Sequence, residues 1–233
     1  MTKTLTCKST VLILLLATLA APLAQAQTKM TVHSHERQQF VPVAGANLSG
    51  SPATQYELNT VYGKTRSALE FLDRFWGGVF ATSKRPFRRP GLKWMLSGQA
   101  FYKSEDHTIY LNAAFLVGRM RAAAEQTRTD GDMAFIIILA HEYGHSVQQQ
   151  LGLLGGDCLR VELQADRMAG AFARAVKEAN LLDPGDFDEA TYTFFAGRDA
   201  TDKYYACAHG SGTQRVEAFH TGLKGGATVA LQR

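Results

Sequence analysis

The chain has 233 residues, of which 45% are hydrophobic and 20% are charged. This composition is typical of a soluble globular protein, and the length suffices for one ordinary domain plus a short appendage. The formal net charge is +4. No basic stripe interleaved with aromatic residues and no nucleic-acid-binding motif accompanies that charge, so nucleic acid is not expected as a partner.

The first 26 residues have the layout of a secretory signal peptide. Lys3 and Lys8 precede an almost wholly apolar run at residues 11–19, and Ala24-Gln25-Ala26 offers a small-x-small cleavage site. The apolar core is about a dozen residues long, shorter than the roughly 20 that a spanning helix needs. We therefore expect an exported protein, periplasmic or secreted, with no membrane contact after cleavage. An uncleaved signal anchor is the alternative.

Residues 27–54 are polar and predict a loosely ordered leader, followed by one domain over residues 55–233. Helical spacing of apolar residues predicts a helix over residues 56–80. Short runs rich in β-branched and aromatic residues predict a small antiparallel sheet from residues 92–96, 100–102 and 108–111. Further helices are predicted at residues 113–126, 132–151, 157–177, 187–197 and 213–223. Asp132, Asp157 and Asp186 are expected to cap three of these helices.

The helix over residues 132–151 contains His141-Glu142-Tyr143-Gly144-His145, an H-E-x-x-H motif. The i, i+4 spacing puts both imidazoles on one face, where they can share a metal ion. Glu142 is offset by about 100° on the helix, so it faces the open coordination position, where a base must stand to take a proton from bound water. Gly144 leaves room beside the ligands.

A catalytic zinc needs a third protein ligand and one open position. The metzincin extension would require Gly at position 148 and His at position 151, and the chain has Gln148 and Leu151. The next helix offers Glu162 and Asp166, which are four residues apart and share a face. We expect Glu162 to bind the metal and Asp166 to hydrogen-bond a ligand imidazole. The reverse assignment, with Asp166 as the ligand, stays open because both are oxygen donors.

These segments resemble the putative neutral zinc metallopeptidases, which are found mostly in bacteria. The resemblance rests on residues 138–148 and 162–166, extends to residues 101–102, 109–111 and 209–215, and covers roughly residues 69–225. It implies a zincin-type fold: α+β, mainly helical, with the small antiparallel sheet beside the active-site helix. The arrangement of Glu162, Ala165 and Asp166 is also similar to that of gluzincin-like membrane and heat-shock peptidases, which implies Glu162 as the third ligand of a single Zn²⁺. Ser146 and Arg167 depart from the family pattern, so substrate preference is not carried over.

Downstream residues complete the expected site. Cys158 and Cys207 are expected to pair, since two cysteines in an exported protein favour a disulfide; two buried thiols are the alternative. That bridge would hold His209 near the zinc helix, where it could stabilise the oxyanion formed on peptide attack. An ordinary loop histidine is the other interpretation. Arg215 could position His209, Asp166 or a substrate carboxylate, or lie on the surface. Tyr204 and Tyr205 are further oxyanion candidates.

The sequence thus predicts a zinc-dependent endopeptidase that hydrolyses peptides or proteins with a metal-activated water and Glu142 as general base. A strand at residues 108–111, placed at a sheet edge, could bind extended substrate by strand addition. Two rivals remain: a catalytically silent zinc-bearing peptide-binding module, and a metal-dependent amide hydrolase acting on cell-wall peptides. The sequence does not define an oligomeric state.

Overall fold

A computed structural model describes residues 51–197 and 209–232. The predicted signal peptide, the leader up to residue 50, Tyr204, Tyr205 and Cys207 lie outside these residues. The described chain forms six helices and three strands in the order α1 (Gln55–Thr82), β1 (Gly91–Met95), β2 (Ala100–Lys103), β3 (Thr108–Asn112), α2 (Ala113–Thr127), α3 (Met133–Leu151), α4 (Cys158–Glu178), α5 (Asp186–Ala196) and α6 (Gly212–Ala230). None of the described helices combines the length and apolar character needed to cross a membrane.

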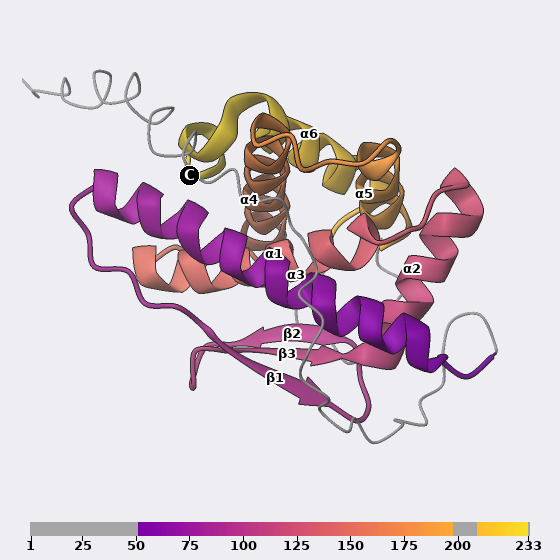
Figure 1. Cartoon of the computed structure of the whole chain (residues 1–233). Coiled ribbons are helices and arrows are strands. Elements are labelled where there is room, and N and C mark those ends of the chain that lie inside the picture. The colour runs from indigo at the N-terminus through magenta and orange to yellow at the C-terminus, as the bar shows by residue number, and fades with distance from the viewer. Residues whose placement is uncertain (1–50, 198–208, 233) are drawn as a thin grey trace, which may run out of the picture.

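The helix α3 is the centre of the fold. It contacts α1, α2, α4 and α5, and its other neighbours include the strand β2. Figure 1 shows the sheet on one side of the long α1 and the helices α4, α5 and α6 on the other. The apolar stretch at the start of α3, with Phe135 and Ile137 fully buried, forms part of the core. The helix that carries the H-E-x-x-H motif is therefore held on nearly all sides.

The helix α1 is held in place by side-chain contacts at its start and again further along its length. Thr54 and Glu57 form a capping box at its start, and the Glu57 carboxylate also accepts two hydrogen bonds from Arg121 of α2. Further along α1, Asp73 accepts a 2.6 Å hydrogen bond from the Tyr143 hydroxyl. Tyr143 lies inside the H-E-x-x-H motif, so α1 anchors α3 beside the predicted metal ligands.

The sheet is mixed, not purely antiparallel. Its strand order is β1-β3-β2, with β1 parallel and β2 antiparallel to β3. The strand β3 pairs on both sides and also contacts α2 and α3, and the side chains of Ile109 and Leu111, which share one face, are fully buried. The expectation that residues 108–111 form a free edge for substrate is therefore wrong. The edges of this sheet are β1 and β2.

Two helix starts differ from the expected caps. Asp132 precedes α3 but forms no capping hydrogen bond, because its carboxylate pairs with Lys64 of α1. The cap is supplied from α5: Glu189 accepts hydrogen bonds from the backbone N–H groups of Gly131 and Met133, at 3.0 and 2.8 Å. Asp186 likewise does not cap α5 and accepts instead from the Asp183 N–H. Asp157 caps α4 as expected.

The last helix is longer than its sequence predicts. α6 runs to Ala230 and includes a non-helical residue, Gly226, where the expected end lay. It packs mainly along α4 and also against α5. Between α5 and α6, Phe194 and Phe219 contact each other at a centroid distance of 5.2 Å. This packing brings the start of α6 over α4, next to the predicted metal site.

Candidate metal centre

The two motif histidines meet on the buried face of α3. Their Nε2 atoms are 3.2 Å apart, and their side chains are 5% and 13% exposed for His141 and His145. The α-helical repeat produces this pairing, because residues four apart lie one turn above each other. The two Nε2 atoms point toward each other, and the two Nδ1 atoms are hydrogen-bonded to Asp166 and Gln148.

Glu162 reaches that place from α4. Its Oε2 atom lies 3.2 Å from His141 Nε2 and 3.5 Å from His145 Nε2. The same Oε2 is buried and has no hydrogen bond of acceptable geometry among the described residues. Buried carboxylate oxygens are normally satisfied, so an orphaned one facing two imidazole nitrogens fits a cation. Zinc with ligands at about 2.0–2.2 Å requires donor atoms about 3.3–3.5 Å apart, which these separations match.

The close approach of α3 and α4 depends on Gly144. A Cβ atom at this position would lie 3.3 Å from the Cα and O atoms of Ala165 and from Met168 Cβ. Gly144 precedes His145, and Ala165 lies between Glu162 and Asp166, so the two helices touch where they carry the site. The glycine therefore makes room for the backbone of α4 more than for a bound ligand.

Asp166 holds His141 from the other side. Its Oδ1 accepts a 2.7 Å hydrogen bond from His141 Nδ1, which leaves the Nε2 lone pair free for a metal. Arg215 of α6 donates two hydrogen bonds to the same carboxylate, at 2.9 and 2.7 Å, and a third to the Gly197 carbonyl at 2.8 Å. Asp166 is fully buried and Arg215 is 7% exposed. The Asp166 carboxylate thus faces Nδ1 of His141, whereas the Glu162 carboxylate faces Nε2 of the same ring.

His145 is held by a residue that sequence reasoning missed. Its Nδ1 lies 2.8 Å from Gln148 Oε1. The amide nitrogen of Gln148 donates to the Val161 carbonyl and to Gln164 Oε1 on α4, which fixes Oε1 as the acceptor for His145. Gln148 is three residues after His145 and so lies on the same helix face. That spacing was the only sequence signal for this role.

The electrostatics of the site favour positive charge between the imidazoles and Glu162. Burial disfavours the charged form of His141, but Asp166, Glu162 and Glu142 outweigh it and raise the pKa of His141 to about 10. Burial also opposes the charge on Glu162, yet His141 and His145 hold its pKa well below the usual range. A cation placed among these groups would be stabilised by the same carboxylates.

Glu142 lies on α3 next to His141 and is 8% exposed. Burial lowers the pKa of His209, against opposing effects of Glu162 and, more weakly, Glu142. Burial also opposes the charge on Arg215, but Asp166, with smaller contributions from Glu162 and Glu142, raises the pKa of Arg215. His209 itself lies just before α6 with its Nε2 atom 3.5 Å from Glu162 Oε2. The structure therefore gathers residues from α3, α4 and the segment before α6 around one point.

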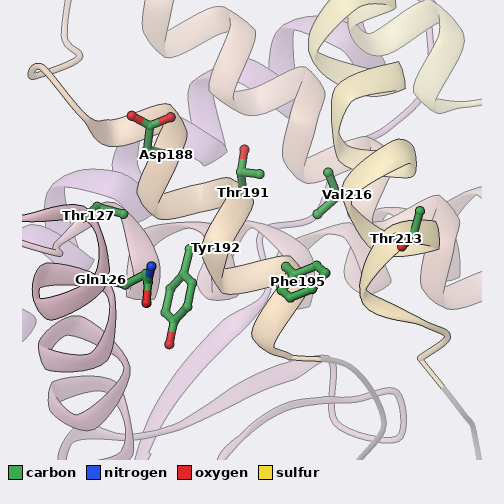
Figure 2. Close-up of a pocket in the computed structure, with 8 residues that line it drawn as sticks. All are labelled: Gln126, Thr127, Asp188, Thr191, Tyr192, Phe195, Thr213 and Val216. Atoms are coloured by element: carbon green, nitrogen blue, oxygen red, sulfur yellow. The ribbon is translucent and has the colours of Figure 1, made fainter.

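A separate pocket of about 580 Å³ opens between α2, α5 and α6 (Figure 2). In Figure 2, Tyr192 and Phe195 of α5 face this pocket. Its lining consists of Gln126, Thr127, Asp188, Thr191, Tyr192, Phe195, Thr213 and Val216. None of these lining residues is a predicted site residue.

Comparison with known proteins identifies similar chains. The uncharacterized protein YpfJ of Escherichia coli K12 is 26% identical over 189 residues, which cover 65% of this chain and 63% of that protein. The uncharacterized protein Rv2575 of Mycobacterium tuberculosis H37Rv is 36% identical over 83 residues, or 31% of this chain and 27% of that protein. The chain thus spans less than two thirds of the length of these relatives. No solved structure matches it.

A family model described as putative neutral zinc metallopeptidase matches residues 2–158. The match begins before the region in which we noted a resemblance and ends before Glu162, Asp166 and Arg215. It includes positions 141–145 and covers well over half of the chain. On this basis the chain belongs to the putative neutral zinc metallopeptidase family.

Proposed function

We propose that this protein is a zinc-dependent endopeptidase with one Zn²⁺ held by His141, His145 and Glu162. The observation that carries the proposal is the buried Glu162 Oε2, which has no hydrogen bond among the described residues and lies 3.2–3.5 Å from the two Nε2 atoms. Bound zinc would lower the pKa of a water molecule and polarise the scissile carbonyl. The rest of the chemistry falls to the side chains around it.

Glu142 would act as the general base, since it is adjacent to His141 on the same helix and its carboxylate has no hydrogen bond or ion pair among the described residues. It would take the proton from the attacking water and deliver it to the leaving amine. Asp166 would keep His141 in the tautomer with Nδ1 protonated, and Arg215 would hold Asp166 in place by its paired hydrogen bonds. The oxyanion role predicted for His209 remains a prediction.

Substrate binding by strand addition needs an edge strand, and β3 does not provide one. β2 is an edge strand that packs against α3, and its outer side carries no strand among the described residues. We therefore propose β2 as the strand that binds extended peptide. Phe101→Lys, at a position that is 37% exposed, should raise KM more than it lowers kcat. Unchanged kinetics would exclude this edge.

Export and the Cys158–Cys207 disulfide also remain proposals. They are supported by the composition of residues 1–26 and by the presence of two cysteines after that segment. The bridge can be tested by labelling the denatured mature protein with a thiol reagent before and after reduction. Labelling that requires reduction is expected, and labelling of both cysteines without it would refute the pairing.

The decisive experiment compares Glu142→Gln with wild type for zinc content and for cleavage of a fluorogenic peptide library. We expect one zinc per chain in both proteins and a loss of about 10²–10⁴-fold in kcat for the variant. Glu217→Gln, an exposed glutamate on α6, is the matched control and should behave as wild type. Glu162→Ala should lose the metal.

Each rival function gives a different result. A wild type without zinc after reconstitution would refute the metal site. Zinc with peptide binding but no cleavage would favour the binding module, whereas cleavage confined to cell-wall peptides would favour the amide hydrolase. Full activity of Glu142→Gln would refute the role of Glu142 as the base.

A further inference from the structure

A third imidazole, that of His209, lies as close to Glu162 as His145 does. His209 Nε2 is 3.5 Å from Glu162 Oε2, the same separation as that of His145 Nε2 from this atom. The donor atoms of His141, Glu162 and His209 all lie within 4.8 Å of one another. The rings of His141 and His209 are tilted by 36° with centroids 6.1 Å apart. Three imidazole nitrogens therefore surround Glu162 Oε2, and His209 shares a candidate metal-binding group with His141 and Glu162.

The separations from Glu162 Oε2 are those of neighbouring vertices around one ion. Tetrahedral zinc with nitrogen and oxygen ligands at about 2.0–2.2 Å has vertices about 3.3–3.5 Å apart. Glu162 Oε2 lies 3.2, 3.5 and 3.5 Å from the Nε2 atoms of His141, His145 and His209. An oxyanion-stabilising histidine would instead stand about 3 Å from a substrate oxygen, further out from the metal ligands.

The fold holds His209 at this position through the start of α6. Ser211 and Gln214 form a capping box that fixes the first turn of α6. One residue later, Arg215 ties the same turn to Asp166 of α4 by two hydrogen bonds. His209 is thus only two residues before Ser211, the N-cap of a helix whose first turn is bound to the helix carrying Glu162.

His209 is also the member of the set that can leave most easily. Its side chain is 30% exposed, against 5% for His141, 13% for His145 and 10% for Glu162. It precedes α6 and is not part of a helix, whereas the other three project from α3 and α4. A donor on such a segment can move without unpacking the core.

We propose that His209 is a fourth protein ligand of the zinc site in the substrate-free protein. The resting site is then closed, and a peptide must displace His209 to reach the metal. This inference rests on the proposed function, because it presupposes that zinc binds at His141, His145 and Glu162. In this proposal His209 binds the metal before substrate arrives, and it could contact the oxyanion only after a peptide has displaced it.

The test measures the metal and not the activity. Full-length mature protein is stripped of metal, and its zinc affinity is determined by competition with a chromophoric chelator for wild type, His209→Ala and His209→Gln. Loss of residues that merely support a ligand costs about 10–100-fold in metal affinity, so loss of a ligand should cost at least as much. His220→Ala is the matched control, since His220 lies exposed on α6 and contacts Thr191. Its affinity should equal that of wild type.

Cobalt substitution separates a ligand from a neighbour. The visible spectrum of Co²⁺ reports the donor set directly, so His209→Ala and His209→Gln should both change it. Added imidazole should restore the wild-type spectrum in His209→Ala, where the side chain leaves space, and not in His209→Gln. Equal zinc affinity and equal Co²⁺ spectra in wild type and both variants would overturn the inference while leaving the three-ligand site intact. Failure of wild type to bind zinc would instead refute the proposed function.

Discussion

Replacing Gly144 by alanine should push α3 and α4 apart where they carry the two halves of the proposed metal site. The added Cβ would lie 3.3 Å from three atoms of α4, and two of these belong to the backbone of Ala165. Backbone atoms in a packed helix cannot rotate away, so the helices themselves must separate by a few tenths of an ångström. The separation would move the histidines of α3 away from Glu162.

The expected size follows from two opposing effects. Overpacking a well-filled contact costs about 1–3 kcal/mol, and alanine is better than glycine in a helix by up to about 1 kcal/mol. Gly78→Ala in α1 isolates the second effect, because a Cβ there meets nothing within 4 Å. The two variants should therefore differ by about 1–3 kcal/mol, or roughly 2–12 °C in Tm for a domain of this size.

The assay is thermal unfolding of zinc-stripped and zinc-loaded protein, together with zinc affinity by chelator competition. Gly78→Ala should match or exceed wild type in Tm and bind zinc equally well. Gly144→Ala should unfold at a lower temperature and bind zinc more weakly. If Gly144→Ala has the Tm of Gly78→Ala and wild-type zinc affinity, the contact between α3 and α4 at this glycine does not position the site.

Three further predictions concern individual carboxylates and amides. Asp166→Asn should weaken zinc binding by about 10–100-fold in chelator competition, since the neutral amide holds His141 less firmly; unchanged affinity would argue against that support. Gln148→Ala should also weaken zinc binding and lower the free energy of unfolding, because buried polar groups of α4 lose their partner, and a variant as stable as wild type would contradict this. Burial, with help from neighbouring acids, raises the pKa of Asp186 to about 6. The folded state therefore keeps a proton that the unfolded chain loses near pH 4, and stability falls as pH rises from about 4 through 6. In zinc-stripped protein, Asp186→Asn should be neutral at pH 4 and about 1–2 kcal/mol more stable than wild type at pH 7.5 by denaturant unfolding; a gain independent of pH would refute the assignment.

The sequence was most informative where the signal is local. The i, i+4 repeat of an α-helix alone brings His141 and His145 together, and it likewise puts Glu162 and Asp166 on one face of the next helix. The helix and strand positions followed from local periodicity, and observed bounds differ from the expected ones mostly by a few residues. α6 is the main exception, because the chain resumes a helical path after Gly226 and packs its last turns into the fold.

Local signals failed where a partner comes from a distant part of the chain. Asp132 looked like a cap, but Lys64 of α1 binds its carboxylate and Glu189 of α5 takes over the capping. The strand at residues 108–111 looked like an edge, yet β1 returns parallel to it and makes it central. Neither the missing Asp132 cap nor the central position of β3 can be predicted from the few residues on either side.

The sequence by itself thus determined which candidate metal donors are present, on which helices, and at what spacing. Only the tertiary structure decided how they meet. The packing of α4 against Gly144 turns Glu162 toward the Nε2 atoms and Asp166 toward Nδ1, and the docking of α6 brings Arg215 and His209 to the same place. The physical reason is that helix periodicity acts over one or two turns, whereas contacts between helices depend on how the whole core is filled.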